Sequence, residues 1–331
     1  MTNNQIIRLL LPIVRVFVVT LFTPALQCQQ ISQTVELPIR IAEMSLIVVP
    51  VYVNARGPFD FVLDTGSTVT MIDEGFALEM GLPREGPTNI VSVQGGETEI
   101  STAEAASVVL EGAEVRRLKL GVVKSLKGLP VKARGVLGED FLRRFDVLID
   151  YDKKKLTLMQ GMNPILQHLC GEHVPLLLTG NDTTGAVANR LIVQATLPSL
   201  RKNAVSLLLD TGTNAMVLYG ERLGIMQHGT APVSISGNAV SAGSAVEASS
   251  QVLPVRLGTA GVEIRVQTLV IHTTTALDVE GMLPASAFRS VYISHAGGYA
   301  IFDPIVRTEA QIAYYMTRMK RAGSACEAQV C

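Results

Sequence analysis

The chain has 331 residues, of which 48% are hydrophobic and 17% are charged, and its formal net charge is −1. This composition excludes a mostly disordered chain, and the balanced charge argues against a nucleic-acid partner. The length is sufficient for two domains that each bury a core.

The N-terminal segment 1–30 differs from the rest of the chain. Two arginines precede the apolar stretch 16–22, which small and polar residues follow. This order is typical of a secretory signal peptide. A spanning helix is the alternative reading, but Pro12 and Arg15 leave too short an apolar run. Lipid attachment at Cys28 is disfavoured because Gln27 is not small. We therefore expect a signal peptide or membrane-targeting segment over 1–30 and an exported protein that is periplasmic, secreted or membrane-anchored.

The first half of the chain after this segment is predicted to be mostly β. Short apolar runs separated by turn residues predict strands, and Gly95 and Gly96 lie between two such runs as in a hairpin. The spacing of apolar residues over 73–82 predicts one helix. The predicted strands lie within 34–61, 90–100, 118–138 and 147–158, and a short helix is expected over 139–145.

The second half repeats this plan from residue 191 onward. Gly, Pro, Asn and Asp residues gather in the stretch between the halves and make it the best boundary. After Pro304, apolar residues on one helix face predict a C-terminal helix. We therefore predict an N-terminal lobe over 31–160, an interlobe connection over 161–185, a C-terminal lobe over 186–305, and a helix and tail over 306–331.

One short motif occurs in both halves. Residues 61–68 read FVLDTGST and residues 207–214 read LLLDTGTN. In each copy apolar residues predict a buried strand that reaches an aspartate, and a glycine then permits a tight turn. A single D-T-G is also typical of an ordinary strand-to-turn junction. A buried carboxylate, however, is expected only where hydrogen bonds or a special chemistry hold it.

Further features recur at matched distances from Asp64 and Asp210. The tetrapeptide GVLG ends at Gly138 and GMLP ends at Pro284, and each lies equally far beyond the aspartate of its own half. The chain is therefore predicted to contain an internal duplication whose offset equals the separation of the two aspartates. A duplicated half with one aspartate suggests a pseudo-twofold molecule in which the two Asp loops meet.

The paired D-T-G motifs resemble those of the aspartic peptidases. Each motif is followed later in its half by two apolar residues, and in the first half a glycine comes next. The short halves and the segment VYVNARGPF at 51–59 resemble most the retropepsin-like bacterial aspartyl proteases. The resemblance covers residues 45–160 and, more weakly, 185–305. It implies a mostly β, bilobal acid-protease fold, in which two duplicated retropepsin-like β-barrel lobes enclose a cleft.

The resemblance assigns Asp64 and Asp210 as a catalytic dyad. Two adjacent carboxylates cannot both ionise easily, so the pair keeps one proton. The ionised member activates a water and the protonated member donates to the scissile carbonyl oxygen, which requires no metal and no cofactor. Sequence does not assign which aspartate is protonated.

The residues that follow each aspartate are expected to support the dyad. The glycines let backbone N–H groups approach the carboxylates, and in the family the threonine hydroxyls bond across to the opposite loop. The remaining two hydroxyls are expected to donate to the carboxylates and favour their charged form, which predicts activity at acidic pH. The supporting residues are Thr65, Gly66 and Ser67 in the first loop and Thr211, Gly212 and Thr213 in the second.

The Gly-Gly hairpin occupies the place of the family's flap, which closes over the substrate. We expect Gln94, Gly95 and Gly96 to contact an extended peptide or protein substrate, which adds a strand to the hairpin. An ordinary surface hairpin is the alternative interpretation. Membrane association through the N-terminus is a further expectation, and the two halves of one chain are expected to form a monomer.

Two departures from the family pattern leave a second function open. Pro284 stands where the first half has Gly138, and proline neither donates a backbone hydrogen bond nor adopts a positive φ. The flap also lacks the tyrosine of pepsin-like enzymes. The alternative is therefore a non-catalytic peptide-binding or structural protein with a degenerate second lobe. A dimer in which each half pairs with another chain is a third reading.

Overall fold

The computed structural model describes residues 33–43, 45–91, 97–161, 169–178, 190–225, 231–234, 245–259, 262–272 and 278–306. The predicted targeting segment over 1–30 and the apolar helix face predicted after Pro304 lie outside these residues. Within the described ranges, no helix combines the length and apolar character that crossing a membrane requires. The described chain consists mainly of β-strands, which confirms the predicted fold class.

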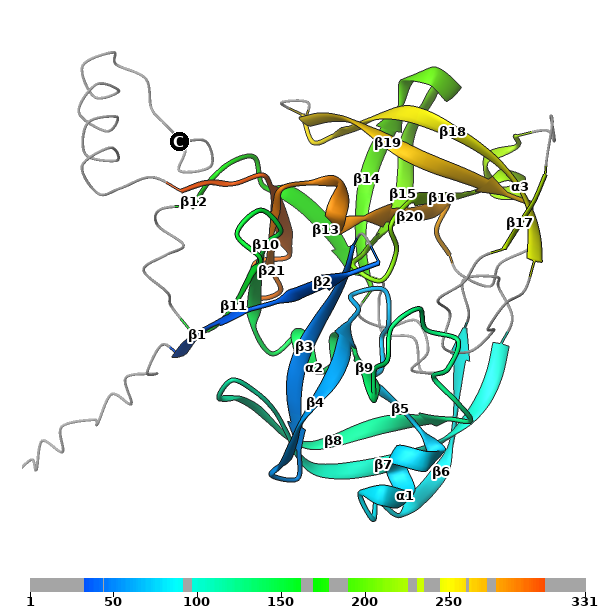
Figure 1. Cartoon of the computed structure of the whole chain (residues 1–331). Helices are drawn as coiled ribbons and strands as arrows, with labels where there is room; N and C mark the ends of the chain where they lie inside the picture. The colour runs from blue at the N-terminus through cyan, green and yellow to red at the C-terminus, as the bar shows by residue number, and fades with distance from the viewer. Residues whose placement is uncertain are drawn as a thin grey trace, which may run out of the picture. The chain divides into compact units, whose positions relative to one another are not determined.

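Eight strands of the N-terminal lobe form one sheet in the order β2-β3-β4-β9-β5-β8-β7-β6 (Figure 1). Strand β3 also pairs with β7, so the sheet curls back on itself around a core. Two short helices accompany the sheet, and the first is capped by the Asp73 carboxylate, which accepts the Phe76 N–H at 2.7 Å. The elements are β2 (Arg40–Ala42), β3 (Leu46–Val53), β4 (Arg56–Leu63), β5 (Met71–Asp73), α1 (Glu74–Glu79), β6 (Arg84–Val91), β7 (Glu97–Leu110), β8 (Ala113–Val123), β9 (Gly135–Leu137) and α2 (Glu139–Leu142).

The C-terminal lobe repeats this order as β14-β15-β20-β16-β19-β18-β17, with β14 also paired to β18. Its elements are β14 (Leu191–Leu197), η2 (Pro198–Leu200), β15 (Lys202–Asp210), β16 (Met216–Tyr219), α3 (Gly220–Leu223), β17 (Ala231–Ser234), β18 (Ala245–Leu257), β19 (Val262–Ile271), β20 (Gly281–Pro284) and η3 (Ala285–Ala287). The registers agree as well. Leu63 lies opposite Leu137 in one lobe, and Leu209 lies opposite Leu283 in the other, with the same shift that separates the two aspartates. The internal duplication is therefore confirmed in the strand topology.

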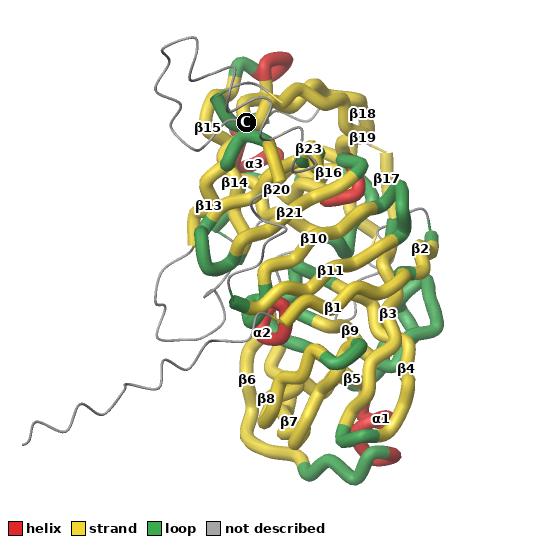
Figure 2. Tube along the Cα trace, turned by 90° about the vertical axis from the view of Figure 1, so that its left-hand side faces the viewer, coloured by secondary structure: helices red, strands yellow, loops and turns green. Residues whose placement is uncertain are grey.

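Both lobes contribute strands to a continuous array in the order β1-β11-β10-β21-β22-β13. Figure 2 shows β1, β11, β10 and β21 side by side. Strand β10 pairs with β21 so that Val147 lies opposite Ile293, its own counterpart in the repeat. The pseudo-twofold axis therefore passes through this pair. The strands are β1 (Gln33–Pro38), β10 (Asp146–Asp150), β11 (Lys155–Gln160), β13 (Val174–Leu178), β21 (Ser290–Ser294) and β22 (Tyr299–Phe302), and a separate pair joins β12 (Leu169–Cys170) to β23 (Ile305–Val306).

One large core cluster includes buried residues from both lobes. The aromatic side chains of Phe61, Phe76 and Phe141 are fully buried in it. Burial of each of these side chains stabilises the fold by about 2–3 kcal/mol. The lobes are thus held together by a shared core and by backbone pairing, although the predicted boundaries between them remain predictions.

Candidate active site

The two D-T-G loops lie at equivalent points of the two lobes. Asp64 directly follows β4, and Asp210 is the last residue of β15. The chain must leave the sheet at each aspartate because the following Thr-Gly pair turns away from the strand direction. Asp210 is buried, with 5% of its surface exposed, and Asp64 is half-buried.

Four reciprocal hydrogen bonds join the loops across the pseudo-twofold axis. The Thr65 hydroxyl donates to the Leu209 carbonyl at 2.8 Å and accepts the Thr211 N–H at 3.1 Å. The Thr211 hydroxyl donates to the Leu63 carbonyl at 2.8 Å and accepts the Thr65 N–H at 3.0 Å. Both threonines are 1% exposed, so water does not compete for these bonds. The cross-loop bonding that the resemblance implied is therefore present.

The two glycines lie against the carboxylates of the opposite loops. A Cβ placed on Gly66 would lie 2.7 Å from Asp210 Cγ. A Cβ on Gly212 would lie 2.8 Å from Asp64 Oδ1. Each glycine therefore leaves the space that the other lobe's carboxylate occupies, and the two aspartates come within hydrogen-bonding contact of each other.

The two carboxylates have unequal surroundings. Asp64 Oδ1 accepts the N–H groups of Gly66 at 2.9 Å and Ser67 at 3.2 Å. Asp210 Oδ1 accepts one N–H, that of Gly212, at 2.6 Å. Burial raises the pKa of Asp64, while its hydrogen bonds with Asp210, Gly66 and Ser67 lower it. Burial and then the charge of Asp64 raise the pKa of Asp210 well above its ordinary value. Asp210 is therefore the member better suited to hold the shared proton.

The prediction that the Ser67 and Thr213 hydroxyls donate to the carboxylates is wrong. Ser67 Oγ donates to the Val69 carbonyl at 2.8 Å, and Thr213 Oγ1 donates to the Ala215 carbonyl at 3.0 Å. Each hydroxyl closes a local turn with the residue two positions later, a bond such side chains form readily. The argument for an acidic pH optimum from these hydroxyls therefore fails.

Two positions beneath the loops differ between the lobes, and the two differences compensate each other. The Gly138 N–H donates to the Thr70 hydroxyl at 3.0 Å, and that hydroxyl donates to Asp140 Oδ1 at 2.6 Å. In the repeat, the fully buried Met216 takes the place of Thr70 and offers no oxygen. Pro284, which has no N–H, therefore leaves no donor unsatisfied there. Gly138 has φ −99°, so this position does not require a positive φ in the first lobe either.

The hairpin predicted about Gly95 and Gly96 is formed by β6 and β7, whose described pairing extends to Val91 opposite Glu97. Gln94, Gly95 and Gly96 lie outside the described residues. The corresponding hairpin of the second lobe pairs β17 with β18. The role of these hairpins in substrate binding stays a prediction.

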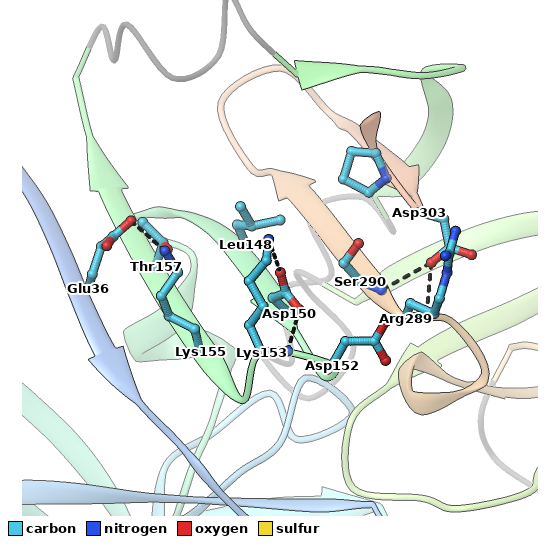
Figure 3. A pocket seen from close by; sticks show the side chains of 11 residues that line it. Glu36, Leu148, Asp150, Asp152, Lys153, Lys155, Thr157, Arg289, Ser290 and Asp303 are labelled. Atoms are coloured by element: carbon cyan, nitrogen blue, oxygen red, sulfur yellow. Dashed lines mark hydrogen bonds and ion pairs between the residues drawn. The ribbon is translucent and has the colours of Figure 1, made fainter. Parts of the chain in front are cut away.

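A separate pocket of 550 Å³ is lined by residues of the interlobe strands and their turns, and none of the D-T-G residues lines it (Figure 3). Most of its charged groups satisfy one another. Lys155 pairs with Glu36 at 3.0 Å, and Lys153 pairs with Asp150 at 3.1 Å. Its lining residues are Glu36, Leu148, Asp150, Asp152, Lys153, Lys155, Thr157, Arg289, Ser290, Asp303 and Pro304. Among the residues that the structure describes, no group of three or more His, Cys, Asp and Glu side chains could hold a metal ion.

Sequence reasoning did not foresee a polar cluster between the lobes. His295, in the turn after β21, contacts Glu139 at the start of α2. Asp146, at the start of β10, accepts hydrogen bonds from the Tyr292 hydroxyl at 2.9 Å and from the Ser294 hydroxyl at 3.3 Å. The sequence signal that could have drawn attention to Glu139 is its position directly after the GVLG tetrapeptide.

A family profile supports the resemblance over part of the N-terminal lobe. Residues 49–141, which include the first D-T-G loop and reach into α2, match the profile of a family described as aspartyl protease. Among solved structures, a retropepsin-like aspartic protease from Rickettsia conorii is similar at 21% identity over 39% of this chain and 93% of that chain, with a TM-score of 0.31. No curated protein matches the chain. The match to the aspartyl protease profile includes the first of the paired D-T-G motifs and confirms the predicted resemblance to the aspartic peptidases.

Proposed function

We propose that the chain is an aspartic endopeptidase, which hydrolyses peptide bonds with a water activated between Asp64 and Asp210. The observation that carries this proposal is the convergence of two duplicated loops on one pair of carboxylates. The cross-loop bonds of Thr65 and Thr211 fix the loops, and the glycines leave room for the carboxylates. Burying two carboxylates side by side destabilises the folded state. Such a pair is expected where the protein uses it for general acid–base catalysis.

The unequal hydrogen bonding suggests a role for each aspartate. Asp64, which accepts two backbone N–H groups, is the ionised base that takes a proton from the attacking water. Asp210, which accepts one, donates its proton to the scissile carbonyl oxygen as the water oxygen bonds to the carbonyl carbon. The C–N bond of the resulting diol then breaks as Asp64 gives the proton it took to the leaving nitrogen and one diol hydroxyl returns its proton to Asp210. The products are an amine and a carboxylic acid, and the dyad again holds one proton, on Asp210.

The proposed substrate class rests on the hairpin that the resemblance assigns as the flap. An extended peptide can pair its backbone with the β6–β7 hairpin, in the manner of an added strand. Because the described loops meet within one chain, a monomer is the simplest active form. Export remains part of the proposal and depends on the segment 1–30 alone.

The second candidate, a peptide-binding protein without turnover, rested on Pro284. Two observations weigh against it. Asp210 keeps its place opposite Pro284 in the β15–β20 pairing, and the loss of the N–H is matched by the loss of its acceptor at Met216. The second loop therefore keeps its geometry with proline in place.

A binding measurement separates the two functions. The first ligand is a peptide whose scissile amide is replaced by a hydroxyethylene group, and we expect it to bind the unmutated chain at one site. The second ligand is the same peptide with its amide intact, bound to the Asp210→Asn variant so that it is not cleaved. We expect the first affinity to be at least about 100-fold higher than the second. Calorimetry measures both affinities. Equal affinity for the two ligands would refute catalysis and favour simple peptide binding.

A further inference from the structure

The Glu139–His295 contact joins the catalytic loop of one lobe to a turn of the other. Glu139 follows Gly138, and its N–H donates to the Ser67 carbonyl at 2.8 Å. A Cβ on Gly138 would itself lie 2.8 Å from that carbonyl oxygen, which shows how closely this segment packs beneath the Asp64 loop. Any displacement of Glu139 is therefore passed directly to the loop that carries Asp64.

The Glu139 side chain points away from this loop to the second lobe and is buried there. Its carboxylate is 1% exposed and its Oε2 lies 2.8 Å from His295 Nε2. The other ring nitrogen, Nδ1, lies 2.6 Å from the Phe145 carbonyl oxygen. The Phe145 carbonyl can only accept, so Nδ1 carries a proton, and Nε2 donates a second proton to Glu139 when that carboxylate is ionised. With Glu139 ionised, both contacts are hydrogen bonds only when His295, 9% exposed, is a charged imidazolium.

The charges around this pair come from two elements. Asp140 and Arg143 lie at α2, and Asp146 lies on β10, where it also accepts the Ala296 N–H at 3.4 Å. Asp146 and Glu139 favour the charged form of His295, and Arg143 favours the charged form of Glu139 while Asp140 opposes it. Burial alone would lower the pKa of His295, but the hydrogen bond and charge of Glu139, the Phe145 carbonyl and Asp146 raise it above its ordinary value. Burial raises the pKa of Glu139.

The repeat lacks this pair on the other side. The position of Glu139 is taken in the second lobe by Ala285, which is fully buried. The segment beneath the Asp210 loop therefore has no carboxylate at this position with which to form such a contact. Within the described residues, the two lobes have diverged so that only the Asp64 loop is tied to its neighbour through an ion pair.

We propose that Glu139 and His295 are positioning residues for the Asp64 loop, and that they hold the loop in its cleaving geometry when His295 is protonated. This inference rests on the proposed function. A charge pair of this burial and double hydrogen bonding holds its partners in one geometry, and removal of either partner leaves the other buried and uncompensated. The pair is complete at a pH above the titration of Glu139 and below that of His295. It weakens as the pH rises through the folded-state pKa of His295, because a neutral ring cannot donate to both acceptors.

The first test follows the His295 ring by NMR across the pH range, in the unmutated chain and in Glu139→Gln. We expect the unmutated His295 to titrate at a higher pH than His173, whose pKa burial lowers. Glu139→Gln should move the His295 titration to lower pH and leave that of His173 in place. An unchanged His295 titration would overturn the proposal.

The second test measures cleavage kinetics. We expect His295→Gln and Glu139→Gln each to lower kcat about 10-fold, as for a sub-ångström misplacement of a catalytic group, with KM within about twofold. The double variant should be no slower than the slower single variant because the two residues act through each other. His173→Gln, a ring stacked on Tyr299 at 3.9 Å, is the matched control and should keep full activity.

The outcomes separate the two proposals. No cleavage by the unmutated chain would refute the proposed function and the positioning role together. Normal kcat in both single variants, or effects that multiply in the double variant, would refute only the positioning role. Cooperative thermal unfolding of each variant confirms that a low kcat reflects the site and not loss of the fold.

Discussion

Thr65→Val isolates the contribution of the cross-loop bonds because valine has nearly the shape of threonine without its hydroxyl. Thr65 Oγ1 donates to the Leu209 carbonyl and accepts the Thr211 N–H, and both contacts are buried. The substitution therefore removes two hydrogen bonds at once. It also leaves a backbone carbonyl and a backbone N–H without a partner between the lobes.

The expected cost follows from these two groups. An unsatisfied buried donor or acceptor costs about 1–3 kcal/mol, so the variant with two such groups should lose about 2–6 kcal/mol of unfolding free energy. This is a large share of the roughly 5–15 kcal/mol that stabilises a typical protein. Thr65→Ser, which keeps the hydroxyl and loses one methyl group, should lose only about 1 kcal/mol.

Urea unfolding of the unmutated chain and the two variants measures these differences. Activity should follow the same order, since loosened loops misplace the carboxylates. If Thr65→Val unfolds at the same urea concentration as Thr65→Ser, the bonds observed across the axis do not stabilise the assembled lobes and the reasoning is refuted.

Three further predictions concern the dyad. Gly66→Ala should lower kcat about 100-fold in steady-state kinetics, because its Cβ would lie 2.7 Å from Asp210 Cγ. Asp210→Asn should raise the melting temperature at pH 7. The pKa of Asp210 is raised in the folded state, so the unmutated chain loses stability as this carboxyl ionises at rising pH, and asparagine does not ionise. Thermal scans down to about pH 4 should show the melting temperatures of the two proteins converge. Pro284→Gly should lower the melting temperature slightly, by loss of chain stiffness, and should not raise kcat.

The features that sequence predicts well are local or repeated. Alternating apolar residues and Gly or Pro turns predict the strands. The GVLG and GMLP segments form β9 and β20, and each strand pairs in the same register with the strand that leads to the aspartate of its own half. The helix predicted over 73–82 forms over Glu74–Glu79, because the Asp73 cap starts it and Gly81 ends its turn. These features depend on a residue and its near neighbours, so a single sequence is sufficient.

The features that sequence does not predict depend on side chains from distant segments. The Ser67 hydroxyl had two partners within reach, a carboxylate and the Val69 carbonyl, and only the three-dimensional turn decides between them. Glu139 and His295 are 156 positions apart, and no spacing rule connects them. Their contact exists because β10 and β21 pair at the pseudo-twofold axis.

Pro284 shows that the effect of a departure from a family pattern depends on the residues around it. In isolation, proline in place of glycine predicts a lost hydrogen bond. In the structure the acceptor is also gone, since Met216 replaces the hydroxyl of Thr70. Removing both partners of a hydrogen bond can be nearly neutral, whereas removing one is costly. The second lobe therefore replaces a polar support by an apolar one.

The most direct test of the account is the hydrolysis of an unstructured protein mixture from about pH 3 to 8 by the chain and by its Asp64→Asn and Asp210→Asn variants. Asp60→Asn, on an exposed carboxylate paired with Arg40, is the control. We predict that the unmutated chain and the control cleave and that both dyad variants lose activity, because neither loop alone supplies both base and acid. Cleavage by either dyad variant at the unmutated rate would contradict a single site shared by the two lobes.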